Sequence, residues 1–162
     1  GLLRRYLQSE TADLHQRNMR IRVIGDRARF SDDIVTLIEG AEEMTAGNTG
    51  LNLTAALSYG GRQDIAAATR ALAQQAADGA LDPTTIDEEM VSQHLWTRDL
   101  PDPDLLIRTS KEQRISNFLL WQCAYTELVF VDALWPEFDR SHLEQCIDEY
   151  NRRERRFGAV AG

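Results

Sequence analysis

Residues 104–110 read Asp104-Leu105-Leu106-Ile107-Arg108-Thr109-Ser110 and carry the strongest fold signal in the chain. Pro101 and Pro103 break the chain just before this stretch, and its apolar residues are continuous rather than alternating. A continuous apolar run of this length is typical of a parallel strand that is covered on both faces. The stretch therefore predicts a strand over 104–108, with a polar loop at its carboxyl end.

Three more short segments, rich in β-branched or apolar residues, are predicted strands: 20–25, 51–58 and 127–131. Apolar residues at helical spacing predict helices that end near Asn18, run from Ser31 to just before Gly47, follow the Gly60-Gly61 break and run to Gly79, span Pro83 to Leu95, and begin at Ser141. Strands that alternate with helices predict an α/β fold, a parallel sheet flanked by helices on both faces. In such sheets ligands bind beyond the carboxyl ends of the strands.

Composition narrows the class of protein. The 162 residues are 43% hydrophobic, which favours one ordered domain over 1–162. The longest apolar runs are far shorter than the roughly 20 residues that span a bilayer, so we expect no transmembrane segment and a cytoplasmic protein. The net charge of −8 argues against broad nucleic-acid binding, so an anionic ligand must meet a local cluster of arginines.

Residues 108–117 supply such a cluster directly after the predicted strand. They contain Arg108 and Arg114 among the hydroxyl groups of Thr109, Ser110 and Ser116. Arginine presents a planar fork of donors to phosphate oxygens, and hydroxyl or backbone N–H groups can fill the remaining acceptor positions. The alternative is an Arg–Glu surface pair in a solvated loop, which often contributes nothing measurable.

A family resemblance favours the phosphate interpretation. Residues 104–110, followed by Arg114-Ile115-Ser116-Asn117-Phe118-Leu119-Leu120-Trp121-Gln122, resemble the signature of the cis-prenyltransferases of the undecaprenyl diphosphate synthase type. Further similar segments occur in the family's order: 47–51, 59–62, 124–128, 134–138 and 154–158. The chain is identified as the carboxy-terminal part of a single cis-prenyltransferase domain.

The resemblance implies an enzyme that condenses isopentenyl diphosphate with an allylic diphosphate, such as farnesyl diphosphate, to give a cis-polyprenyl diphosphate of undecaprenyl type. It implies that Arg108, Arg114, Ile115 and Ser116 bind isopentenyl diphosphate, and that Glu127 helps to hold Mg²⁺. It also implies a homodimer and peripheral association with the membrane when the lipid product is released. Trp121, Tyr125, Trp135 and Phe138 are expected in the core or at a subunit contact.

Two departures from the family pattern limit these expectations. The Asp-Gly-Asn-Gly-Arg loop, whose Asp serves magnesium and catalysis in the family, does not occur in these residues. We therefore expect no catalytic residue in this chain, a truncated sequence and an inactive isolated fragment, with a non-catalytic partner subunit as the alternative function. Lys111 stands where the family usually has Gly, which restricts the loop backbone.

Overall fold

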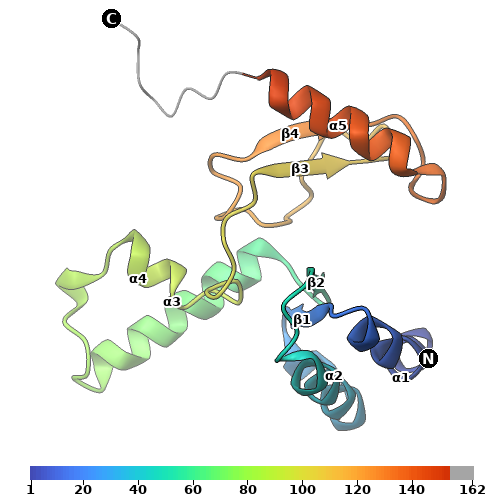
Figure 1. The fold of residues 1–162 in the computed structure, drawn as a ribbon. Coiled ribbons are helices and arrows are strands. Elements are labelled where there is room, and N and C mark those ends of the chain that lie inside the picture. Colours follow the sequence, from blue (N-terminus) through green and yellow to red (C-terminus); the bar gives the residue numbers. More distant parts are fainter. Residues whose placement is uncertain (154–162) are drawn as a thin grey trace, which may run out of the picture. The chain divides into compact units, whose positions relative to one another are not determined.

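The computed structural model describes residues 1–153. The chain forms two compact units, Gly1–Thr97 and Arg98–Gly162 (Figure 1). The first unit contains α1 (Leu2–Gln16), β1 (Arg20–Ile24), η1 (Arg27–Arg29), α2 (Asp32–Thr45), β2 (Asn52–Ala56), α3 (Gly61–Ala77), η2 (Pro83–Thr85) and α4 (Glu88–Ser92). The second contains β3 (Leu105–Arg108), β4 (Glu127–Phe130), η3 (Trp135–Glu137) and α5 (Arg140–Arg152).

All four predicted strands are present, and they form two parallel pairs, one in each unit. In the first unit β1 pairs with β2 from Arg20 opposite Asn52 to Ile24 opposite Ala56. In the second unit β3 pairs with β4 from Leu105 opposite Glu127 to Arg108 opposite Phe130. Parallel strands joined through helical or long connections confirm the predicted α/β class.

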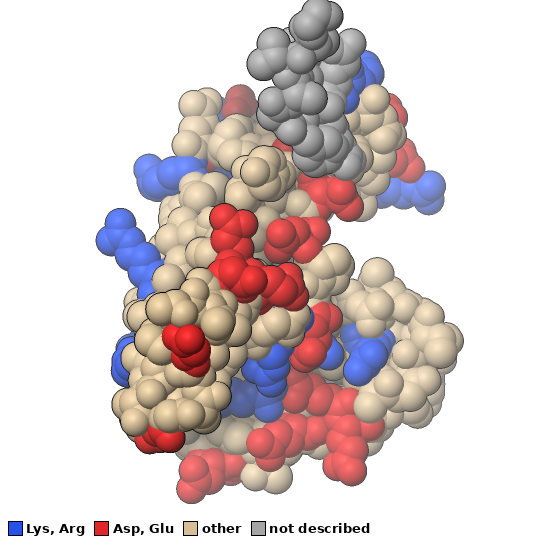
Figure 2. Space-filling view, turned by 90° about the vertical axis from the view of Figure 1, so that its left-hand side faces the viewer, with Lys and Arg blue, Asp and Glu red and all other residues tan. Residues whose placement is uncertain are grey.

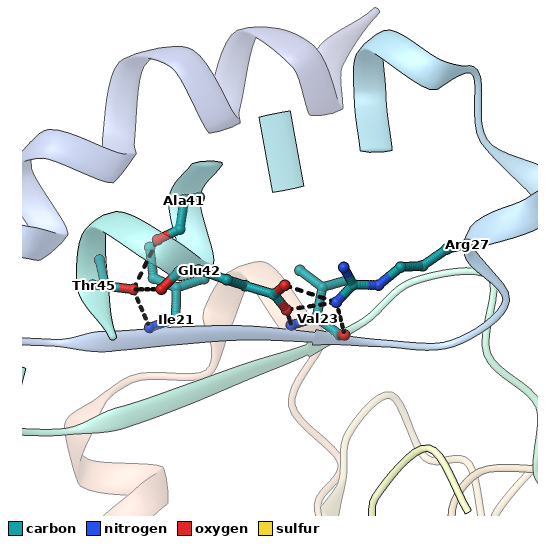
Figure 3. A network of polar contacts seen from close by, with 6 residues as sticks. All are labelled: Ile21, Val23, Arg27, Ala41, Glu42 and Thr45. Carbon is teal, nitrogen blue, oxygen red and sulfur yellow. Dashed lines mark hydrogen bonds and ion pairs between the residues drawn. The ribbon is translucent and has the colours of Figure 1, made fainter. Parts of the chain in front are cut away.

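Helices α1 and α2 both contact β1, and α2 closes the outer edge of that strand with side chains (Figures 1 and 3). Thr45, which is fully buried, accepts a hydrogen bond of 3.0 Å from the backbone N–H of Ile21. The same hydroxyl donates to the carbonyl of Ala41 in its own helix at 2.8 Å. A strand edge otherwise leaves such N–H groups without partners, so Thr45 seals the edge of β1.

A second seal lies one step along the same edge. Glu42 Oε1 accepts a hydrogen bond of 2.8 Å from the backbone N–H of Val23 (Figure 3). Arg27 then donates from Nη2 to both oxygens of this carboxylate, at 2.7 and 2.8 Å, and to the carbonyl of Val23 at 3.2 Å. Arg27 thus neutralises the negative charge of Glu42 where β1 leads into η1.

The segment 47–51, one of the segments similar to the family, has a structural role in this fold. Asn18 accepts a hydrogen bond from the backbone N–H of Thr49 through its side chain and from that of Gly50 through its carbonyl, both at 2.9 Å. A Cβ atom on Gly50 would lie 2.4 Å from the Asn18 carbonyl oxygen, so only glycine fits. The segment therefore holds the start of β2 beside the start of β1.

Two helix predictions need correction. The helix expected over 83–95 is two separate elements, because Asp82 caps η2 and Asp87 starts α4 again by accepting a hydrogen bond of 2.8 Å from the N–H of Met90. The last helix begins one residue earlier than Ser141, at Arg140, because Asp139 is its N-cap and accepts a hydrogen bond from the N–H of His142 at 3.0 Å. In both cases an aspartate side chain, one of the favoured N-cap types, marks where the helix begins.

The surface of the described residues is consistent with the acidic composition. On the face drawn in Figure 2, acidic side chains form several patches, and basic side chains are scattered among them. Within residues 1–153, no helix is both long enough and apolar enough to cross a bilayer.

Candidate functional site

The loop that follows β3 is held in place by the segment that follows β4. The N–H of Val131 donates to the carbonyl of Arg108 at 2.8 Å, the N–H of Ser110 to Ala133 at 2.8 Å, and the N–H of Lys111 to Val131 at 3.3 Å. These three backbone hydrogen bonds form a clasp between residues 108–111 and 131–133. Because the N–H groups of Ser110 and Lys111 are used inside the clasp, these two groups are not available to a bound anion.

Two residues of the clasp have an uncommon backbone conformation. Ser110 and Lys111 have φ angles of +67° and +58°, in the left-handed region that disfavours residues with a Cβ atom. Further along the loop Ser116, Asn117 and Leu119 have φ angles of +48°, +64° and +46°. The concern raised by Lys111 in place of Gly is therefore justified, since the loop does adopt a conformation that suits Gly.

Arg108 is the last residue of β3, at the carboxyl edge of the strand pair. Its Nε is buried and has no hydrogen-bond partner among the described residues. A buried donor of a charged group is costly to leave unpaired and is usually satisfied by protein, water or ligand. The position and the unpaired donor together fit a residue that binds an anion.

Arg114 lies in the connection between β3 and β4 and is largely exposed. Its side chain is 70% exposed, and its Nη2 forms an ion pair of 2.5 Å with Oε2 of Glu112. The predicted alternative, an Arg–Glu surface pair, is thus present in the structure. Exposed pairs of this kind contribute about 0–1 kcal/mol, so a phosphate group can replace Glu112 at little cost. Ile115 is half-buried and Ser116 is exposed in the same connection.

Glu127 lies at the other end of the strand pair. It is the first residue of β4 and pairs in register with Leu105, so about 10 Å of strand separates it from Arg108. Its Oε2 accepts a hydrogen bond of 2.8 Å from Nη1 of Arg153, which also donates to the carbonyl of Leu128 at 3.0 Å. The hydrogen bonds to Glu127 and then to Glu149 raise the pKa of Arg153 above its ordinary value.

These contacts test whether the residues present fit a magnesium ion. A magnesium site needs several oxygen ligands, and the one predicted carboxylate already neutralises an arginine. No group of three or more His, Cys, Asp or Glu residues within 1–153 is arranged to hold a metal. The described residues of one copy therefore do not make a complete magnesium site.

Comparison with known proteins gives the family. The model of the family described as putative undecaprenyl diphosphate synthase matches residues 1–158. The chain belongs to this family, the cis-prenyltransferases. Isoprenyl transferase 2 of Bradyrhizobium diazoefficiens is 52% identical over 160 residues, which are 99% of this chain and 64% of that protein. A ditrans,polycis-undecaprenyl-diphosphate synthase of Xanthomonas axonopodis is 54% identical over 155 residues, 96% of this chain and 60% of that protein.

Solved cis-prenyltransferase structures share the fold. Lavandulyl diphosphate synthase from Lavandula x intermedia, in complex with dimethylallyl diphosphate, matches with a TM-score of 0.91 and 38% identity over 97% of this chain and 68% of that one. A probable undecaprenyl diphosphate synthase from Campylobacter jejuni matches with a TM-score of 0.83 and 36% identity over 98% and 72%. The chain spans less than two thirds of the length of the curated relatives quoted above.

Sequence reasoning missed two features of this cis-prenyltransferase chain. The first is Arg153, whose guanidinium meets Glu127, 26 residues earlier in the sequence. The second is the clasp with residues 131–133, which involves backbone groups alone and leaves no trace in side-chain type. The matched segment 154–158 lies outside the described residues.

Proposed function

We propose that the whole protein is an isoprenyl transferase that joins isopentenyl diphosphate to an allylic diphosphate, and that these residues supply the isopentenyl diphosphate half-site. The observation that carries the proposal is Arg108, whose buried Nε is unpaired within residues 1–153 at the carboxyl edge of β3. The Xanthomonas relative is named as specific for (2E,6E)-farnesyl diphosphate, which supports that primer here. We propose undecaprenyl diphosphate, a cis-polyprenyl diphosphate, as the product because the Xanthomonas relative is named for it.

In this proposal the chain acts by holding a diphosphate. Arg108 donates its fork of N–H groups to phosphate oxygens, Arg114 exchanges Glu112 for the ligand, and the hydroxyl of Ser116 fills a remaining acceptor. Ile115, next to Ser116, contacts the short isoprenoid carbon skeleton. Anchoring the diphosphate orients the isopentenyl double bond, and a fixed orientation supplies much of the rate gain in two-substrate reactions.

In the proposed reaction all bonds that form or break belong to the two substrates, and no side chain of this protein is covalently modified. The terminal alkene carbon of isopentenyl diphosphate forms a bond to C1 of the allylic substrate, the C1–O bond breaks, and diphosphate leaves with the electron pair. A proton from C2 of the isopentenyl unit is then lost, which restores a double bond. The side chains proposed here stay bound to the second diphosphate, which the product retains.

An apolar cavity in the first unit offers a surface for an isoprenoid hydrocarbon chain. It has a volume of about 180 Å³ and lies between α1 and the β1–β2 pair. Its walls come mostly from apolar residues, among them Leu7, Val23 and Leu53, with Glu10 and Thr11 as the polar members. We propose that this cavity forms one wall of the space that takes up the growing hydrocarbon chain, because apolar surface binds such a chain without unpaired polar groups.

Magnesium dependence remains part of the proposal for the whole protein. Glu127 is the one carboxylate among these residues that we propose for the ion, and its pairing with Arg153 means that it cannot form the site alone. A bound magnesium ion would neutralise diphosphate charge. The role of Glu127 is tested by the magnesium concentration that gives half-maximal activity, which Glu127→Gln should raise.

We also propose a homodimer formed through the second unit. Several large apolar side chains there are exposed: Tyr125, Leu134, Trp135, Leu143 and Ile147. Trp135 is 73% exposed although its ring stacks on Phe138 at 6.1 Å, and such patches mark interaction surfaces. Trp135→Asp should convert the dimer to a monomer by light scattering. A cytoplasmic location, with transient contact to the membrane for product release, completes the proposal.

The experiment for the activity measures incorporation of labelled isopentenyl diphosphate onto farnesyl diphosphate by the full-length protein with magnesium. Arg114→Ala should lower kcat/KM at least tenfold, because the cation contributes to binding and orientation. Equal rates for the wild-type and variant proteins would reject the assigned role. The alternative, a non-catalytic partner subunit, gains support if no Asp-Gly-Asn-Gly-Arg loop precedes these residues in the encoded protein.

A further inference from the structure

Lys111 is the only lysine among the 162 residues, which otherwise use arginine for every basic side chain. It lies between Arg108 and Arg114, in the loop that the clasp holds at the carboxyl edge of β3. The residue is exposed, and its ammonium group forms no ion pair or hydrogen bond within residues 1–153. The proposed function gives this cation no role.

The backbone conformation at Lys111 is one that lysine rarely adopts. Its φ of +58° follows the φ of +67° at Ser110, so two consecutive residues adopt the left-handed conformation. Glycine would adopt it without steric cost, and asparagine at a smaller cost than lysine. Strain of this kind persists where the surroundings impose it and often accompanies a functional site.

The charges around Lys111 add a second reason. Glu112 is the neighbouring carboxylate and is already paired with Arg114, while the Arg108 side chain has no partner within the described residues. Two cations thus remain unmatched within four residues of a chain whose net charge is −8. An anion bound at this edge would neutralise both.

We propose that Lys111 is a third cationic ligand of the diphosphate, beside Arg108 and Arg114. This inference rests on the proposed function and deepens it. Lysine provides a compact charge on a flexible stem with three donors, and it binds phosphate oxygens as a point charge. The clasp fixes the Lys111 backbone through its hydrogen bond to Val131, so the side chain needs to order only its own stem.

Three substitutions in the full-length protein separate the charge of Lys111 from its backbone. Lys111→Arg keeps the charge, Lys111→Ala removes the charge and keeps the strain, and Lys111→Gly removes both. Equilibrium binding of isopentenyl diphosphate is measured by calorimetry in EDTA, so that no divalent ion contributes. We expect the Ala and Gly variants to bind about three- to tenfold more weakly and the Arg variant to bind within about twofold of wild type.

A second measurement gives a readout that a structural role would not change. Acylation of the Lys111 amine is followed by mass spectrometry of its peptide, with and without inorganic diphosphate. Protection by diphosphate, but not by the same concentration of chloride, is the expected result. Unchanged acylation would contradict direct contact between the ammonium group and the anion.

The outcomes distinguish this inference from the proposed function. If Arg114→Ala weakens binding and Lys111→Ala does not, the third-ligand role is wrong and the half-site remains. If neither substitution changes binding of isopentenyl diphosphate, both are wrong. If the Ala variant weakens binding but the Gly variant does not, backbone strain rather than charge is responsible, which also overturns the inference.

Discussion

Arg153, at the end of α5, donates a hydrogen bond of 2.8 Å from Nη1 to Oε2 of Glu127, the first residue of β4. The same guanidinium donates to the carbonyl of Leu128 and, through Nη2, to Glu149 in its own helix. The two side chains are 33% and 26% exposed, so the contact is partly shielded from water. It fastens the last turn of α5 to the start of β4 and determines how available the Glu127 carboxylate is.

We expect Arg153→Ala to lower the free energy of unfolding by about 1–2 kcal/mol, because hydrogen bonds to charged groups contribute more than neutral ones. The measurement is urea denaturation of the full-length protein. Arg152→Ala is the matched control, since among residues 1–153 the exposed Arg152 bonds only the carbonyl of Asp148 one turn earlier, and it should change stability by less than about 0.5 kcal/mol. Equal effects of the two substitutions would show that the contact with Glu127 contributes nothing.

The edge of β1 gives a second stability prediction. Thr45→Val keeps the shape of the side chain but leaves the N–H of Ile21 without its 3.0 Å acceptor, which should cost about 1–3 kcal/mol. Thr36→Val is the control, because the Thr36 hydroxyl likewise bonds a carbonyl four residues earlier but lies exposed and accepts nothing from β1. Calorimetric unfolding should separate the two variants, and a shared small effect would mean that α2 does not seal the strand edge.

The N-cap of α5 gives a prediction for pH dependence. The backbone hydrogen bond from His142, and then its side-chain hydrogen bond, lower the pKa of Asp139 below its ordinary value of 3.8. A carboxyl group with a lowered folded-state pKa stabilises the fold above its unfolded value, and this contribution disappears as the pH falls through the folded value. The cap should therefore weaken only below about pH 4.

Asp139→Asn tests this pH window, because asparagine keeps the capping oxygen and cannot titrate. The stability difference between wild type and variant should shrink as the pH falls from 5 toward 3. Urea midpoints across that range are the measurement. A difference that stays constant down to pH 3 would mean that the ionised carboxylate is not part of the cap.

Local signals in the sequence were sufficient for the strands and the long helices. The apolar run at 104–108 and the β-branched run at 20–25 both became strands, and the break predicted at Gly60-Gly61 lies after β2, at the start of α3. The predicted helix boundaries were wrong where an N-cap sets the start of a helix, as at Asp87 and Asp139. Capping depends on side-chain geometry, which the spacing of apolar residues does not encode.

The site was predictable in its residue types but not in its arrangement. Arg108 and Arg114 were candidates from the loop alone, whereas the placement of Glu127 at the opposite end of the strand pair follows from the register of β3 with β4. Register depends on pairing between segments 22 residues apart, which no local pattern fixes. The position of Glu127 relative to magnesium and substrate therefore stays a prediction.

The half-site itself is tested by steady-state kinetics of Arg108→Gln in the full-length protein, with both substrates varied. If Arg108 holds the diphosphate of isopentenyl diphosphate, KM for that substrate should rise at least tenfold, while KM for farnesyl diphosphate stays within about twofold. A rise confined to farnesyl diphosphate, or no change in either KM, would contradict the assignment of these residues to the isopentenyl diphosphate half-site.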